Sequence, residues 1–321
     1  FAEQGVQVKV ISGDNPVTVS RISKEAGIES AESYVDASLL HTEDDFDIAA
    51  QKYNVFGRVT PDQKLKLVKA LKKAGYTVGM TGDGVNDVLA LREADCSIAM
   101  ASGSDAAARA AQMVLLDSDF SHMKEIIGEG RRVVNNLTRS ATLFLYKNIF
   151  SLLLAIFSIV SIMTYPLKPS QITLVSMFNI GLPGFLLALE NNEKKQKARF
   201  LSVTLKRSVP AALTSFFSIA ALVVFGQVFS ISASDIGVAS CFLLALVGFM
   251  ILWKICSPTN RFRRLVFIIC VAGFALGAYF FAPLFSISYV SGPCLMLAAV
   301  FAIAQEAVMR WLTFAVDRIW K

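Results

Sequence analysis

Six long apolar segments dominate the second half of this chain. A helix needs about 20 mostly apolar residues to cross the hydrocarbon core of a bilayer, and its backbone groups must be satisfied within the segment. The sequence therefore predicts an all-α bundle of six transmembrane helices in residues 131–321. Short loops join these helices, which are expected near residues 141–165, 170–190, 208–230, 236–256, 264–284 and 290–312.

The charge of the chain changes where the apolar segments begin. Residues 1–140 contain 16 Lys/Arg and 20 Asp/Glu, a net charge of −4, whereas residues 141–321 contain 15 and 5, a net charge of +10. Most basic residues of the second part lie in the loops after the second and fourth segments and at the C-terminal end. Because cytoplasmic loops carry the excess of Lys and Arg, we expect these loops, the C-terminus and residues 1–138 on the cytoplasmic side of a cell membrane. A soluble helical protein would not segregate its lysines in this way, and the intervening apolar runs argue against a nucleic-acid partner.

A few polar residues interrupt the first two apolar segments. Lys147 and Asn148 lie in "LFLYKNIFS", and Ser176 and Asn179 lie just before the proline of "NIGLP". Polar groups inside a membrane are costly and often belong to an ion pathway, and a proline frees a carbonyl that can face an ion. A snorkelling lysine and ordinary Gly/Pro packing are the alternative interpretations.

Residues 1–130 alternate short apolar strands with amphipathic helices. "VQVKVIS", "VFGRV", "YTVGMTG" and "CSIAM" read as strands, and "TPDQKLKLVKALKKAG" reads as a helix with Thr60 as its N-cap. This alternation predicts an α/β, Rossmann-like domain with a mostly parallel sheet. Ligands of such sheets bind beyond the carboxyl ends of the strands.

Polar clusters follow two of these strands. "SGDN" at residues 12–15 follows the first strand, and "TGDGVND" at residues 81–87 follows a later one. Carboxylates there can bind magnesium while backbone N–H groups hold phosphate oxygens. Lys64, in the first turn of its helix, can supply a positive charge to the same phosphate.

With these motifs in view, the chain resembles the P-type ATPases, ion pumps that phosphorylate one of their own aspartates. "SGDN", "VTPDQK" and "MTGDGVNDVLAL" are similar to conserved segments of that family, with Ser12 in place of its threonine. The resemblance implies a haloacid-dehalogenase-like phosphorylation domain that uses ATP and Mg²⁺. It implies phosphoryl contacts from Ser12, Gly13, Asp14, Lys64 and Asn86, and magnesium-linked carboxylates at Asp83 and Asp87.

Other parts of the family pattern are absent from this sequence. The DKTGT motif, whose aspartate is phosphorylated, does not occur, nor do the nucleotide-binding domain, the actuator domain and the first four membrane helices. We therefore expect a C-terminal part of a pump whose partner is the missing N-terminal part. By itself it is expected to be inactive.

The transported ion follows less directly from the resemblance. Asn148 matches a calcium-binding asparagine of the calcium pumps, but Ser151 and Ile180 stand where those pumps carry acidic residues. The "VLAL" variant and "IGLPGFLLALENN" are similar to a bacterial group named cation-transporting ATPase E, for which calcium transport is implied. Calcium is therefore the expected cation, and magnesium, potassium or protons are the alternatives.

Two other classes of function are compatible with parts of the sequence. A membrane-anchored, phosphatase-like hydrolase would need an acidic pair at the end of a strand, and "TEDDFD" at residues 42–47 lies instead in a polar, helix-like stretch. A non-catalytic membrane protein with a degenerate domain would not be expected to retain Lys64, Asp83 and Asp87. The pump is therefore the preferred hypothesis.

Overall fold

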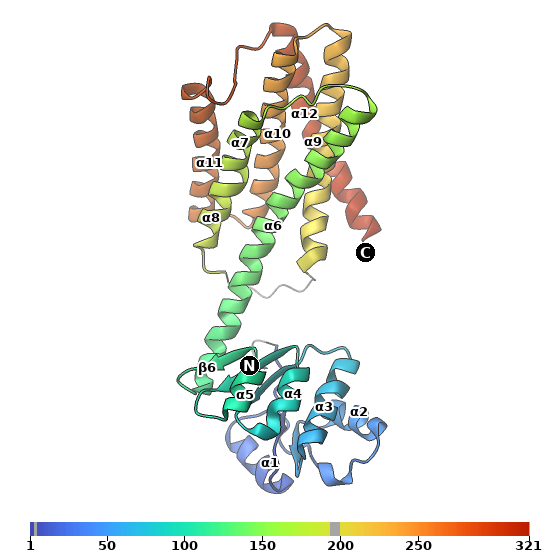
Figure 1. Cartoon of the computed structure of the whole chain (residues 1–321), viewed down its shortest axis with the longest axis vertical. Coiled ribbons are helices and arrows are strands. Elements are labelled where there is room, and N and C mark those ends of the chain that lie inside the picture. The colour runs from blue at the N-terminus through green and yellow to red at the C-terminus, as the bar shows by residue number, and fades with distance from the viewer. Residues whose placement is uncertain (3–4, 193–199, 321) are drawn as a thin grey trace. The chain divides into compact units, whose positions relative to one another are not determined.

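A computed structural model describes residues 1–2, 5–192 and 200–320. The chain separates into two compact units, Phe1–Ile126 and Ile127–Lys321, which Figure 1 shows as an α/β unit and a helical bundle. The sequence predicts this boundary between residues 130 and 131, whereas the two units divide four residues earlier, between Ile126 and Ile127; both positions lie in helix α6 (Met123–Val160). The basic segment at residues 193–199, which the sequence analysis placed in a cytoplasmic loop, lies outside the described residues.

The first unit contains two three-stranded sheets in which all neighbouring strands are parallel. Strand order is β1-β3-β2 in one sheet and β4-β5-β6 in the other. The strands are β1 (Val10–Ile11), β2 (Tyr34–Asp36), β3 (Val55–Gly57), β4 (Gly79–Gly82), β5 (Cys96–Met100) and β6 (Met113–Leu115). The helices are α1 (Pro16–Glu25), α2 (Glu43–Lys52), α3 (Pro61–Lys73), α4 (Val88–Glu93) and α5 (Asp105–Ala110), with 3₁₀ turns η2 (Ala37–Leu39), η3 (Val85–Asp87) and η4 (Phe120–His122).

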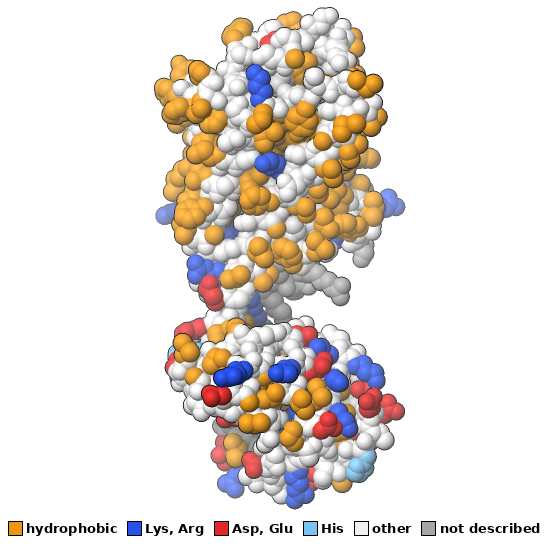
Figure 2. Space-filling model, viewed as in Figure 1, with side chains coloured by type: hydrophobic (Ala, Val, Ile, Leu, Met, Phe, Trp, Pro, Cys, Tyr) orange, Lys and Arg blue, Asp and Glu red, His pale blue; other side chains and the backbone are white. Residues whose placement is uncertain are grey.

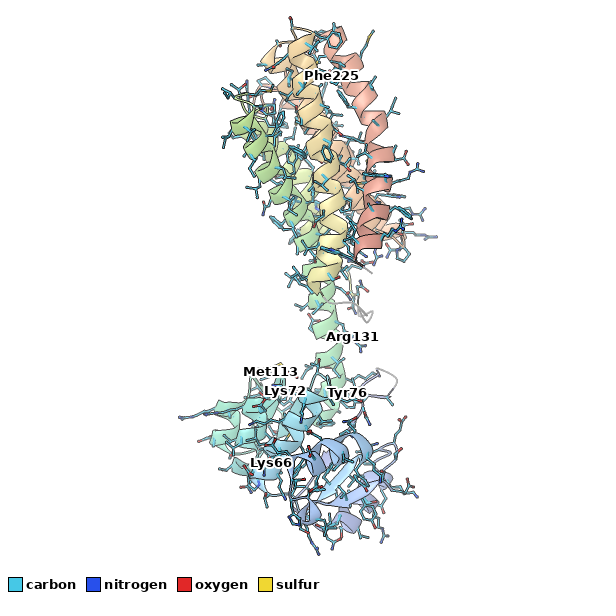
Figure 3. All side chains as sticks on the ribbon, turned by 90° about the vertical axis from the view of Figure 1, so that its right-hand side faces the viewer. Lys66, Lys72, Tyr76, Met113, Arg131 and Phe225 are labelled. Carbon is cyan, nitrogen blue, oxygen red and sulfur yellow. The ribbon has the colours of Figure 1, made fainter. Side chains whose placement is uncertain are left out.

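Local capping explains where the predicted helices of this unit begin. Thr60 accepts a hydrogen bond from the backbone N–H of Gln63, and the Gln63 side chain accepts one from the backbone N–H of Thr60, so α3 starts with a complete capping box. At the other end of α3, Lys72 donates to the backbone carbonyl of Glu93 at 2.7 Å. Figure 3 shows Lys66 and Lys72 on α3. This bond holds the end of α3 against α4, which begins directly after the "TGDGVND" loop.

The strands differ in length from the sequence prediction. The apolar run at residues 6–12 predicts a long strand, but β1 pairs with β3 over only two residues. The run at residues 76–82 pairs only from Gly79 onward. Both β1 and β4 are edge strands with a single neighbour, so apolar sequence alone does not provide them with a full hydrogen-bonded ladder.

The described residues contain six helices that are long and apolar enough to cross a membrane, as predicted, and apart from the first residues of the first one they lie in the second unit. The second of these spans runs from Pro169 to Ala188 and consists of three consecutive segments. Besides α6, the elements are α7 (Pro169–Ser176), the π-helical η5 (Met177–Gly181), α8 (Leu182–Ala188), α9 (Phe200–Val228), α10 (Ala233–Ile255), α11 (Arg261–Phe280) and α12 (Gly292–Ile319).

Helix α10 forms the centre of this bundle. In its most apolar window 72% of the residues are buried, compared with 17% in α12. Figure 2 shows hydrophobic side chains over much of the visible face of the bundle, and Phe225 on α9, labelled in Figure 3, is 46% exposed. An exposed apolar surface of this extent is typical of helices that face lipid or further membrane helices.

Candidate functional site

The loop after β4 has a geometry that requires glycine. A Cβ atom on Gly82 would lie 2.6 Å from the Cβ of Asp87, so a larger residue there would displace the Asp87 side chain. The backbone N–H of Gly84 donates to Asp87 Oδ2 at 3.1 Å. The two glycines therefore allow the chain to wrap around the Asp87 carboxylate before α4 begins.

Lys64 and Asp87 form a buried ion pair. The distance between Lys64 Nζ and Asp87 Oδ1 is 2.6 Å, and the two side chains are 13% and 9% exposed. Lys64 lies in the first turn of α3, and Asp87 is the last residue of η3 and the N-cap of α4, so the pair connects two helices that each follow a strand. The sequence analysis expects Lys64 to supply a positive charge to a bound phosphate, and it does not identify Asp87 as its partner.

The "SGDN" loop is held beside the segment that leads into α3. The backbone N–H of Arg58 donates to the Asp14 carbonyl at 2.7 Å, and that of Val59 donates to the Ser12 carbonyl at 3.0 Å. Ser12 Oγ in turn donates to Asp14 Oδ2 at 3.1 Å. Because Val59 immediately precedes the N-cap of α3, these bonds place Ser12, Gly13 and Asp14 next to the helix that carries Lys64.

Asp83 and Asn86 occupy the exposed part of the β4 loop. Among the described residues, neither side chain has a hydrogen-bond or ion-pair partner, whereas the Asp83 backbone carbonyl accepts a bond from the Ser104 N–H at 2.7 Å. The backbone of Asp83 is thus fixed while its carboxylate is free to bind a ligand. The described part of the chain contains no group of three or more His, Cys, Asp or Glu residues arranged for a metal ion. Magnesium does not need one, because it commonly binds one or two carboxylates together with phosphate oxygens and water.

The acidic segment at residues 42–47 has structural partners instead of a place at the end of a strand. Its acidic residues lie in the first half of α2, where Asp45 completes a capping box with Thr42. Asp47 pairs with Lys73 of α3. Nothing in this geometry provides the strand-end acidic pair that the phosphatase alternative requires.

The polar residues predicted along the ion pathway lie in different environments. Asn179 is fully buried, and its Nδ2 donates to the Ala245 carbonyl of α10 at 3.0 Å, while its Oδ1 has no partner among the described residues. Ser176 donates to the Ile172 carbonyl within its own helix at 2.6 Å. On α6, Lys147 and Ser151 are half-buried and Asn148 is exposed. The structure therefore does not gather these five side chains into a single site within the described chain.

Asn179 lies within η5, and this π-helical segment was not predicted. The Pro183 ring removes an N–H donor from the helix, and the backbone adopts the wider π-helical turn over Met177–Gly181. Single π-helical turns inside α-helices often occur at functional sites. Here the turn carries Asn179 and its unpartnered oxygen into the bundle.

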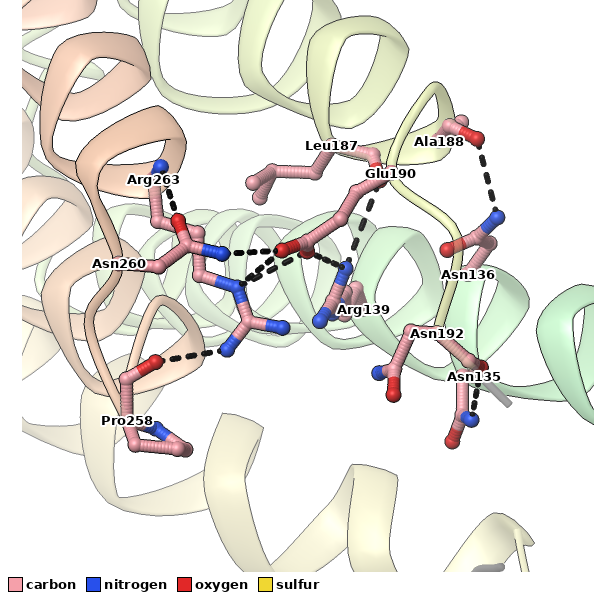
Figure 4. Close-up of polar contacts among 10 residues, drawn as sticks. All are labelled: Asn135, Asn136, Arg139, Leu187, Ala188, Glu190, Asn192, Pro258, Asn260 and Arg263. Carbon is pink, nitrogen blue, oxygen red and sulfur yellow. Dashed lines mark hydrogen bonds and ion pairs between the residues drawn. The ribbon is translucent and has the colours of Figure 1, made fainter. Parts of the chain in front are cut away.

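Sequence reasoning missed a buried ion cluster at one end of the bundle (Figure 4). Glu190 Oε2 lies 3.1 Å from Arg139 Nη1 and 2.9 Å from Arg263 Nε, and Asn260 Nδ2 donates to Glu190 Oε1 at 2.7 Å. The Glu190 side chain is 13% exposed, and each arginine side chain is 9% exposed. We call these four residues the Glu190 cluster. The only sequence indication was an acidic residue at the end of an apolar span beside basic loops.

The fold identifies the class of protein: an α/β domain followed by a set of long apolar helices. This fold combines a parallel α/β domain, with a lysine and two aspartates at the carboxyl ends of its strands, and six helices that are long and apolar enough to span a membrane. In agreement, residues 1–95 match the family model described as haloacid dehalogenase-like hydrolase.

Comparisons with known proteins extend over both units. The probable cation-transporting ATPase exp7 of Streptococcus pneumoniae is 44% identical over 285 residues, which cover 86% of this chain and 36% of that protein. The calcium-transporting ATPase CtpE of Mycobacterium bovis is 42% identical over 224 residues, or 66% of this chain and 28% of that protein. A solved structure of the catalytic domain of the CPx-ATPase CopB-B is 27% identical, with a TM-score of 0.31, over 39% of this chain and 40% of that one.

The chain corresponds to the C-terminal portion of a bacterial P-type cation ATPase and is similar to the CtpE calcium-transporting ATPases. The family predicted from the sequence motifs is thereby confirmed. The chain spans only about a third of the length of these curated relatives.

Proposed function

We propose that this chain forms the later part of an ATP-driven cation pump that works through an aspartyl-phosphate intermediate in a cell membrane. The observation that carries the proposal is the buried Lys64–Asp87 ion pair beside the free Asp83 carboxylate, at the carboxyl ends of parallel strands. Such an arrangement suits phosphoryl transfer, in which catalysis consists mainly of positioning and of stabilising charge.

Each polar residue of the site has a distinct part in this proposal. The Lys64 ammonium and the Ser12 hydroxyl bind phosphoryl oxygens, and Asn86 contacts the same group. Asp83 would hold Mg²⁺, which when bound would neutralise charge on the phosphoryl group. For Asp87 the resemblance implied a magnesium-linked part. Because its carboxylate is bound by Lys64 and by the Gly84 N–H, we propose instead that Asp87 positions Lys64 and closes the loop.

Strands β1 and β4 of the first unit have only one neighbour each among the described strands. Both β1 and β4, the strands that lead into "SGDN" and "TGDGVND", are edge strands. An edge strand presents unpaired N–H and C=O groups that can accept another strand. We propose that a strand ending in the phosphorylated aspartate, from the N-terminal part of the pump, pairs with these edge strands.

Calcium is the cation that we propose for transport. The relatives that match include proteins named calcium-transporting ATPases. The buried Asn179 offers an oxygen that has no partner among the described residues, and Asn148 is exposed on α6. Oxygen atoms from amides, carbonyls and carboxylates are the ligands that calcium prefers.

Calcium should raise phosphoenzyme formation from labelled ATP in the complete pump, whereas magnesium beyond the ATP requirement, potassium and protons should not. Asn148→Ala should abolish the calcium-dependent rise because it removes a ligand oxygen. Lys147→Ala, tested in parallel, should keep the calcium-dependent rise, since an ammonium cannot bind calcium. If no cation changed the signal while Lys147→Ala altered turnover, calcium would be rejected in favour of a pump with a built-in counter-ion.

Asp83→Asn in the complete pump should reduce phosphoenzyme formation at least 100-fold and weaken the dependence on magnesium. The carboxamide keeps the size of the side chain but loses the charge that holds the metal. Asp105→Asn, on the neighbouring α5, is the matched control and should leave both quantities unchanged. Residues 1–321 alone, which lack the phosphorylated aspartate, should take no label. Normal turnover of Asp83→Asn would refute the magnesium assignment.

A further inference from the structure

A cavity of about 270 Å³ lies between α9, α10 and α12. Lys206, Arg207 and Lys254 line it together with Asp317, and Ile251 and Ile255 form part of its apolar wall. These residues belong to the first turns of α9 and to the last turns of α10 and α12. The cavity therefore opens at the end of the bundle that carries the basic loops, away from the residues of the proposed ion pathway.

The residues that line this cavity carry more positive than negative charge. Three cationic side chains and one carboxylate leave a net charge of +2. Lys254 donates to Thr313 Oγ1 at 3.3 Å, whereas Lys206 and Arg207 have no hydrogen-bond or ion-pair partner among the residues that the structure describes. Two cations with free donors beside an apolar wall are the chemistry that recognises a phosphate group attached to an apolar molecule.

The positions of the tryptophans indicate where the cavity lies relative to the boundary between lipid and water. The chain has three tryptophans, Trp253, Trp311 and Trp320, and all lie at this end of the bundle. They are 46%, 69% and 39% exposed. Exposed tryptophans concentrate at the boundary between lipid and water, where the phosphate groups of phospholipids are located. Trp253 directly precedes Lys254, so the charged wall of the cavity lies at that boundary.

We propose that this cavity binds the phosphate-bearing headgroup of an anionic phospholipid. Lys206 and Arg207 donate to the phosphate, Lys254 completes the positive wall, and Asp317 accepts a hydrogen bond from a headgroup hydroxyl. The apolar wall contacts the glycerol and the first methylenes of the acyl chains. At about 270 Å³ the cavity fits a headgroup and is too small for most larger soluble ligands. This proposal requires only that the helices span a membrane, and it does not depend on the transported ion or on phosphoryl transfer.

The test is native mass spectrometry of residues 1–321 in detergent, titrated with phosphatidylglycerol, with phosphatidylcholine and with free glycerol 3-phosphate. We expect one phosphatidylglycerol to bind at least tenfold more tightly than phosphatidylcholine, and glycerol 3-phosphate not to displace it. The double variant Lys206→Gln/Arg207→Gln should remove this preference, and Lys254→Gln should weaken it. Arg207→Lys, which keeps the charge, should retain most of it.

Arg264→Gln is the matched control because it removes one exposed charge from α11 at the same end of the bundle, outside the cavity. It should leave the lipid preference unchanged. Equal binding of the two lipids would overturn the proposal. So would an equal loss of the phosphatidylglycerol preference in Arg264→Gln and in the double variant, because it would show that any surface cation attracts the anionic lipid. Displacement by millimolar glycerol 3-phosphate would overturn the lipid assignment in favour of a soluble phosphate ligand. Because neither Lys206 nor Arg207 bonds to a described residue, the double variant removes no polar contact within the described part of the chain.

Discussion

Replacing Lys64 with alanine is expected to abolish phosphoryl transfer in the complete pump and to lower the free energy of unfolding of the first unit by about 3–5 kcal/mol. Under the proposed function the ammonium has two functions: it binds the phosphoryl group, and it neutralises the buried Asp87 carboxylate, whose Oδ1 lies 2.6 Å from Lys64 Nζ. Its removal leaves a carboxylate that is 9% exposed with only the Gly84 N–H as a described partner. An uncompensated buried charge is among the costliest single changes in a folded domain.

Hydrogen–deuterium exchange of residues 5–126 measures the loss of stability within the first unit itself. Lys66→Ala is the matched control, because Lys66 lies on the same helix and pairs with Asp62 at the surface, where side chains are 39% and 68% exposed. A surface pair of this kind contributes about 0–1 kcal/mol. Equal exchange in the two variants would show that the Lys64–Asp87 pair does not stabilise the unit.

A double variant separates the two functions of Lys64. Lys64→Met with Asp87→Asn removes both charges, so it should recover much of the stability lost in Lys64→Ala. Phosphoenzyme formation should remain absent because no ammonium reaches the phosphoryl group. If activity returned together with stability, Lys64 would be a structural residue alone.

Features that depend on neighbouring residues were predictable from the sequence. The cap of α3 at Thr60 and the turn at Gly82 follow from residue types within a few positions of one another, and the structure confirms both. The apolar spans were equally predictable, because lipid requires about 20 consecutive apolar residues whatever the tertiary fold. The residues at which these spans begin and end were harder to predict. Helix α6 begins near residue 123 in a polar segment that hydropathy does not mark.

Features that depend on distant residues were not predictable. Lys64 and Asp87 are 23 residues apart, and Glu190 and Arg263 are 73 apart, so no local pattern reports either pairing. The same limit applies to the sheets, since short strands such as β2 and β6 carry little periodicity and are formed by pairing with a neighbour. The π-helical turn was missed for a related reason. A proline predicts a disturbed helix but not which of several backbone adjustments will occur.

The Glu190 cluster is expected to stabilise the helical bundle. Glu190→Ala should destabilise the helical bundle by about 3–5 kcal/mol, because it leaves the guanidinium groups of Arg139 and Arg263 buried without their shared counter-ion. These two arginines lie on α6 and α11, and Glu190 follows α8, so the carboxylate joins three elements of the bundle. Thermal unfolding of the chain in detergent measures the loss. Glu306→Ala is the control, since its pair with Arg310 is exposed within a single helix and should contribute about 0–1 kcal/mol.

The pH dependence of stability provides a second readout of the same cluster. Burial acts to raise the pKa of the Glu190 carboxyl, but the bonds from Arg263 and Asn260 outweigh it and hold the pKa below its usual value. A carboxyl whose pKa is lower in the folded state contributes stability that is complete above the unfolded value of about 4.3 and is lost as the pH falls through the folded value. The wild-type chain should therefore lose stability in this acidic range more steeply than Glu190→Gln, which has no proton to bind at this position. Parallel pH profiles for the two proteins would show that the carboxylate is not held by the arginines in the way that the structure describes.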